Sequence, residues 1–270
     1  ILAAIAREQP HFAPPPGVSG ITVPHHLLAA DLIARGFWAA SAGHYRRIIL
    51  ISPDHFRKVQ KPFGTTREDL RSVLGVVPSD AAGVAALAAE TGLVQMLPAV
   101  DYEHGLMAEA PFIRCFWPDA QVIPLLASVN AGPAEWRAMT EVLKPLITPD
   151  TLIVQSTDFS HYRPLAEAVA RDQESIAAID ADDPEVIVPL LQPSHLDSKA
   201  AGYIQLALQR EVFGAEPVVL ANANSVDYGT GSDSTTSYVV AAFVKDAAAG
   251  TAFSYPDEST TLFGGDVLLG

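Results

Sequence analysis

Cysteine is nearly absent from this sequence, because Cys115 is the only one among its 270 residues. A single thiol excludes an internal disulfide framework and any cysteine-rich zinc or iron–sulfur site. The chain also lacks a GxSxG elbow, a P-loop and a GxGxxG fingerprint. These absences argue against a serine hydrolase, a nucleoside triphosphatase and a nicotinamide-dependent enzyme.

Basic residues and long apolar runs are also scarce. Seventeen Lys and Arg stand against 31 Asp and Glu, which gives a formal charge of −14. Such a charge repels phosphate backbones and anionic lipid surfaces, so we expect neither nucleic acid nor a membrane as a partner. No apolar run approaches the roughly 20 residues of a membrane-spanning helix, and the sequence does not open on a secretion signal. We expect a cytoplasmic protein that binds a small-molecule substrate, with a homo-oligomer or a protein partner left open.

The apolar pattern predicts a single α/β domain. Hydrophobic residues make up 49% of the chain, and β-rich apolar runs such as "RRIILIS" and "TLIVQS" alternate with helical segments. This alternation indicates a mostly parallel or mixed central sheet with helices on both faces. We expect the domain to span residues 18–245, after an extended lead-in over residues 1–17 that ends in "APPPG". Residues 246–270 read as a partly disordered C-terminal tail.

Four histidines directly follow predicted strands. His25 and His26 come after "ITV", His55 follows "IILIS" in "SPDHF", and His161 follows "TLIVQS" in "STDFSHY". If these strands run parallel, their carboxyl ends share one edge of the sheet and the histidine loops converge there. Each motif also has a structural alternative, a turn for "PHH" and a helix cap for "SPDHF" and "STDFSHY", and "STDFSHY" is the strongest functional signal of the three. We expect His26 to point away from the others, because adjacent loop residues rarely point the same way.

Imidazoles gathered at one edge are typical of a metal site. Two histidines and one carboxylate with open positions are the signature of non-haem Fe(II), and the same set with a water describes hydrolytic zinc. A further histidine is suited to acid–base catalysis. Asp158, three residues before His161, could orient that imidazole or simply cap a helix. The residue types therefore suit metal-assisted oxidation or hydrolysis.

Two other segments carry polar groups that could reach the same edge. In "DYEHG", Glu103 and His104 are candidates for metal ligands, substrate-binding residues or a solvated acidic turn, and we favour substrate binding at the rim of the site. "NANSVDYGTGSDSTTSY" carries Asp227 and Asp233 on a glycine-rich bend. This bend either brings a carboxylate to the site or forms a hairpin loop.

The remaining candidates have structural explanations. His11, His44 and His195 have no partner pattern around them. Cys115 stands among apolar and aromatic residues of a predicted helix, so we expect a buried thiol rather than a nucleophile.

Taken together, these motifs make the chain resemble the Memo family, also called AmmeMemoRadiSam system protein B. The fold of that family is similar to that of the class III extradiol ring-cleaving dioxygenases. The matching motifs span about Val23 to Val244, nearly the whole predicted domain. They are "VPH", "SPDHF", "EHG" followed by "APF", "STDFSHY" and "GSDSTTSYVVAAF".

The resemblance implies roles for individual residues. His25 and His55 match the family's metal-ligand histidines, and Asp158 and His161 match its aspartate and histidine near the metal. By similarity to the dioxygenases, His161 would be the acid–base group. The third ligand is a cysteine in animal Memo proteins and a glutamate in the dioxygenases. At that place we align Asp227 as a ligand, with Tyr228 beside it as a substrate-binding residue.

We therefore predict an Fe(II)-dependent, dioxygenase-like enzyme that acts on a phenolic or catecholic small molecule, with zinc or copper as alternative metals. Two other functions stay open. One is a non-catalytic Memo-like protein that holds a metal, a ligand or a protein partner. The other is a zinc-dependent hydrolase that acts on esters or amides without O₂.

Overall fold

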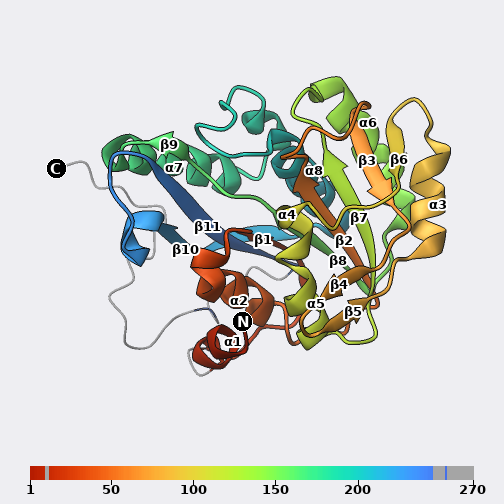
Figure 1. Ribbon diagram of the computed structural model, residues 1–270, viewed down its shortest axis with the longest axis horizontal. Helices are drawn as coiled ribbons and strands as arrows, with labels where there is room; N and C mark the ends of the chain where they lie inside the picture. Colours follow the sequence, from red (N-terminus) through yellow and green to blue (C-terminus); the bar gives the residue numbers. More distant parts are fainter. Residues whose placement is uncertain (10–11, 246–252, 254–270) are drawn as a thin grey trace.

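The centre of the molecule is a mixed β-sheet of nine strands (Figure 1). The computed structural model describes residues 1–9, 12–245 and 253. Eight strands form one path, and β9 (His161–Arg163) pairs with β11 beside it. In sheet order the path is β10 (Glu216–Asn224), β11 (Thr235–Val244), β1 (Val18–Val23), β8 (Thr151–Ser156), β2 (Arg47–Pro53), β7 (Gln121–Ala127), β3 (Phe63–Thr66) and β6 (Val94–Leu97). Strands β4 (Leu70–Ser72) and β5 (Gly75–Val77) form a separate small hairpin.

Helices cover both faces of this sheet (Figure 1). One face carries α1 (Leu2–Glu8), η1 (Leu27–Ala29), α2 (Ala30–Ala39), α4 (His104–Met107) and α5 (Ala110–Phe116). The other carries α3 (Ala81–Ala89), α6 (Pro133–Leu143), η2 (Lys144–Leu146), α7 (Leu165–Asp180), η3 (Pro184–Ile187), α8 (Lys199–Leu208) and the π-helical turn η4 (Gln209–Phe213). A short helix, η5 (Ser225–Tyr228), lies in the connection between β10 and β11.

The central strands carry apolar side chains on both of their faces because helices cover both faces of the sheet. In β2, Ile48 and Leu50 pack into the core on one face, and Ile49 and Ile51 pack into the core on the other. All four are fully buried. The expectation of a mixed α/β sheet with helices on both faces is confirmed.

The strands that precede the histidines lie next to one another. β1 pairs with β8, and β8 pairs with β2, both in parallel. Val23 is paired with Ser156 and Ile51 with Gln155, so the three strands end at nearly the same level. Their carboxyl ends therefore meet at one edge of the sheet, as the sequence predicted.

Two local expectations were wrong. Instead of an extended lead-in, Leu2–Glu8 forms helix α1, which buries Ala4 and Ile5 against the core beside α2. Cys115 is exposed, because Phe112 and Ile113 occupy the buried face of α5. The predicted tail lies outside the described residues, apart from Phe253. None of the helices in the described ranges combines the length and the apolar character that crossing a bilayer requires.

Candidate metal centre

His25 is held rigidly in the loop after β1. Its backbone N–H donates to Oδ1 of Asp158 at 3.0 Å, and its Nδ1 lies 3.2 Å from the Ser156 hydroxyl. Only 2% of the residue is exposed. With Nδ1 engaged, Nε2 is the atom left to face the centre of the cluster, 3.2 Å from Oδ2 of Asp197. This arrangement fixes the ring orientation as ligand histidines require.

His55, in the loop after β2, is fixed from behind by Glu103. The Glu103 carboxylate is fully buried and accepts the His55 backbone N–H at 3.0 Å, while its other oxygen lies 2.6 Å from Nδ1. Because a carboxylate only accepts, Nδ1 carries the hydrogen and Nε2 faces forward. That Nε2 lies 3.4 Å from Oδ2 of Asp197. Glu103, expected at the rim against substrate, instead orients a candidate ligand.

The motif "EHG" has a steric explanation. A side chain at Gly105 would place its Cβ 2.2 Å from the Ser52 hydroxyl at the end of β2, so it would displace this buried hydroxyl. This close approach holds α4 against β2 and places Glu103 behind His55. His104 follows on the outer side, half exposed, with its ring stacked 4.0 Å from that of His55.

Asp197 is the carboxylate at the centre of the cluster, and sequence reasoning missed it. It lies directly before Ser198, the N-cap of α8, and its backbone N–H donates to the carbonyl of Asp158 at 3.0 Å. His195 fixes the same loop, as a structural histidine, through Nε2 at 2.6 Å from Glu174. The available signal was an acidic residue at the start of an alanine-rich helix, where the helix dipole favours an anion.

The donor set of this cluster fits a divalent metal. Among the described residues neither oxygen of Asp197 has a hydrogen-bond partner, although both are buried. The two histidine Nε2 atoms approach Oδ2 at ion-pair distance without hydrogen-bond geometry. Two overlapping groups of ligand atoms converge here, namely His25 with His55 and His104, and His25 with Asp158 and Asp197. A buried carboxylate that lies between two imidazoles, and has no hydrogen-bond partner among the described residues, is a place for a cation.

The pKa values of the clustered residues also indicate a site that suits a cation. Burial acts to lower the pKa of His25, but the carboxylates of Asp158 and Asp197 outweigh it and raise that pKa to about 10. For His55, burial is likewise outweighed by contacts with Asp197 and Glu103, which raise the pKa to about 9. Burial would raise the pKa of Asp197, yet the neighbouring histidines lower it. At neutral pH both imidazoles therefore carry an extra proton, which balances the charge of the neighbouring carboxylates. A bound metal ion can supply this positive charge in place of the two protons.

Behind His25 lies a further buried carboxyl group, that of Glu109. Its Oε1 accepts from the Ser156 hydroxyl at 3.4 Å, and the same hydroxyl contacts His25. Burial raises the pKa of Glu109 well above its usual range. Burial of this carboxyl group thus favours its neutral form behind the cluster.

The cluster opens on a pocket of about 290 Å³. Its wall includes His55 and Asp197 from the cluster and His161 from the loop after β8. Nδ1 of His161 lies 2.5 Å from the Phe159 carbonyl oxygen, which can only accept, so Nδ1 carries the hydrogen. The Phe159 carbonyl, rather than the expected Asp158 carboxylate, therefore orients the His161 ring.

The structure does not bring Asp227 and Tyr228 to the cluster. The Asp227 carboxylate accepts the backbone N–H of Asn224 at 2.8 Å and so caps η5. Tyr228 donates its hydroxyl hydrogen to Asp31 at 2.9 Å, on α2. His26 also turns away, as expected, and its Nδ1 lies 2.7 Å from the Tyr238 hydroxyl. The glycine-rich bend is thus a capped connection, and Asp197 takes the place expected of Asp227.

Fold and site together define an α/β protein with a histidine–carboxylate cluster at the carboxyl ends of parallel strands. The chain belongs to the family of Memo-like proteins, whose family model matches residues 10–242. It is similar to a MEMO1 family protein of Saccharolobus solfataricus, at 23% identity over 230 residues, covering 82% of this chain and 81% of that one. A MEMO1 family protein of Ignicoccus hospitalis is 22% identical over 234 residues, covering 83% and 82%.

A solved structure shares the fold. An uncharacterized protein of Escherichia coli K12 superposes with a TM-score of 0.53 at 16% sequence identity, covering 82% of this chain and 99% of that one. The family resemblance and the fold predicted from the sequence are thereby confirmed.

Proposed function

We propose that this protein is a non-haem Fe(II)-dependent dioxygenase that opens the ring of a phenolic or catecholic small molecule. One observation carries the proposal: Nε2 of His25 and Nε2 of His55 converge on Oδ2 of Asp197, at 3.2 and 3.4 Å, beside a pocket. Two histidines and one carboxylate on one side of an ion, with the other side open, form the ligand set typical of non-haem iron oxygenases. Bound there, iron would supply a Lewis acid with open positions for the substrate oxygens and O₂.

The chain's own residues would provide orientation and proton transfer. Glu103 and Ser156 hold the two ligand histidines with Nε2 forward. His161 stands on the pocket wall with Nδ1 tied to a backbone carbonyl, so its Nε2 can take a proton from a substrate hydroxyl and return it later. His104, half exposed and stacked on His55, covers the outer side of the cluster.

Oxygen uptake tests this proposal. The full chain, loaded anaerobically with Fe(II), is mixed with a panel of catechols, and O₂ consumption is compared with that of free iron. We expect consumption well above the free-iron background. His161→Gln should lower the turnover rate by about 10²–10⁴-fold while the bound iron stays at the wild-type level. The matched control is His44→Gln, at an exposed position away from the cluster.

The outcomes separate the three functions. Oxygen consumption at the free-iron level with every catechol, in protein that retains its iron, would refute the oxygenase proposal. Zinc-dependent cleavage of esters or amides without O₂ would instead support a hydrolase. Tight metal binding with neither activity would leave a metal- or ligand-binding protein.

A further inference from the structure

The loop after β2 carries an arginine in an unusual backbone conformation. Arg57 has φ of +52°, in the left-handed region that costs free energy for residues other than glycine. The buried carboxylate of Asp54 holds this loop, since it accepts the backbone N–H groups of Lys58 at 3.0 Å and Val59 at 2.8 Å. The same loop carries His55, so the Asp54 turn fixes the position of Arg57 relative to the metal centre.

A second residue with a left-handed backbone, Tyr162, lines the pocket of the metal centre together with Arg57. Tyr162 has φ of +59° and a side chain that is largely exposed, and it follows His161 directly. Of the three non-glycine residues with positive φ in the described chain, Arg57 and Tyr162 both line the pocket of the metal centre. Backbone strain gathered at one pocket indicates that these two side chains are positioned for a ligand.

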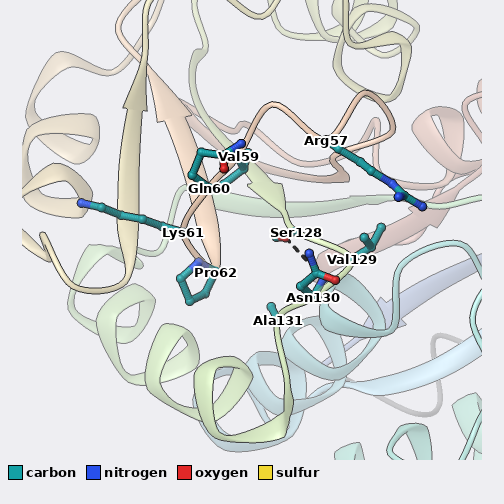
Figure 2. Close-up of a pocket in the computed structure, with 9 residues that line it drawn as sticks. All are labelled: Arg57, Val59, Gln60, Lys61, Pro62, Ser128, Val129, Asn130 and Ala131. Carbon is teal, nitrogen blue, oxygen red and sulfur yellow. Dashed lines mark hydrogen bonds between the residues drawn. The ribbon is translucent and has the colours of Figure 1, made fainter.

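No carboxylate of the described residues pairs with the Arg57 guanidinium. Within the described ranges no hydrogen bond or ion pair engages it, in a chain whose formal charge is −14. It lies where the pocket of the metal centre meets a second pocket of about 350 Å³, and both pockets share Arg57 and Val129. Figure 2 shows the Arg57 side chain extended away from Lys61, which stands at the far end of the second pocket.

We propose that Arg57 binds the carboxylate of a single-ring aromatic substrate whose ring lies in the pocket of the metal centre against Tyr162. A volume of about 290 Å³ has room for a single-ring substrate. An unpaired guanidinium recognises a carboxylate through two parallel hydrogen bonds. The aromatic face of Tyr162, 5.4 Å from the His161 ring, offers a stacking surface beside the acid–base group. This inference rests on the proposed function for the ring chemistry, and adds the charge of the substrate.

Binding of two matched ligands tests the inference without turnover. Calorimetry compares 4-hydroxyphenylacetate with the uncharged 4-hydroxyphenylacetamide, on the full chain with and without added Zn²⁺. We expect the carboxylate to bind at least about tenfold more tightly than the amide. Arg57→Gln should bring this ratio close to one, while Lys58→Gln, at an exposed neighbour that lines neither pocket, should leave it unchanged. Arg57→Gly should lose the preference too, yet unfold at or above the wild-type temperature because it relieves the strain.

Equal binding of the two ligands by the wild type, no measurable binding of either, or an unchanged preference in Arg57→Gln would each overturn the inference. Its failure differs from that of the proposed function. A carboxylate preference that depends on Arg57 in a protein without oxygen uptake leaves the anion site standing. If oxygen uptake is instead equal for catechols with and without a carboxylate, the oxygenase proposal survives and the carboxylate site at Arg57 is refuted.

Discussion

Glu103 offers the sharpest test of how the candidate metal centre is built. Its carboxylate accepts three hydrogen bonds, from Nδ1 of His55 at 2.6 Å, from the His55 backbone N–H at 3.0 Å and from Gly105 N–H at 3.1 Å. Glu103→Gln keeps the shape of the side chain but has only one accepting oxygen. If that oxygen stays on Nδ1 and Gly105, the amide NH₂ faces the His55 N–H, and two donors oppose each other.

Two consequences follow from this geometry. The lost hydrogen bond in a fully buried place should lower the free energy of unfolding by about 1–3 kcal/mol, which a folded domain tolerates. The weaker hold on the His55 ring, and the loss of a negative charge behind it, should weaken metal binding by about 10–100-fold, as when such supporting carboxylates are removed elsewhere. At about 1.4 kcal/mol per tenfold, this is about 1.4–2.8 kcal/mol of binding free energy.

Competition with a chromogenic chelator measures the affinity, and urea unfolding measures the stability. Glu68→Gln, at an exposed position, is the control and should change neither. A folded Glu103→Gln variant whose metal affinity stays within about twofold of the wild type would refute the view that Glu103 orients a metal ligand.

Three further perturbations separate the site from the scaffold. Asp197→Asn should weaken metal binding by more than about 100-fold in the same chelator assay, because it removes the central charge of the cluster; wild-type affinity would exclude Asp197 as a ligand. Asp227→Ala should leave metal affinity unchanged and cost about 1 kcal/mol in urea unfolding through the lost cap of η5, whereas loss of metal would restore Asp227 as the ligand. Burial raises the pKa of Asp172 from 3.8 to about 6, so its contribution to stability is full below about pH 4 and is lost as pH rises through 6. Asp172→Asn should therefore gain up to about 3 kcal/mol relative to wild type between pH 4 and pH 7, and a constant difference across that range would show that Asp172 is not buried in this way.

Motifs next to strands carried most of the successful predictions. His25, His55 and His161 were expected at one edge because each follows an apolar run, and the parallel pairing of β1, β8 and β2 places their loops there. Local patterns sufficed because strand identity depends on neighbouring residues, and the common edge follows from parallel pairing. The helix α1 escaped prediction because its apolar face becomes favourable only through packing against α2.

The sequence by itself determined the family, the sheet with helices on both faces and the histidines that face the pocket, since these depend on apolar periodicity and on short motifs. The tertiary structure alone decided which carboxylate completes the cluster. Asp197 and Asp227 are both aspartates in turn-rich segments, and local chemistry does not distinguish them. They differ because the loop before α8 is hydrogen-bonded to the Asp158 loop, whereas Asp227 is used to cap η5. Which side chains meet across distant loops is set by packing, which no local pattern contains.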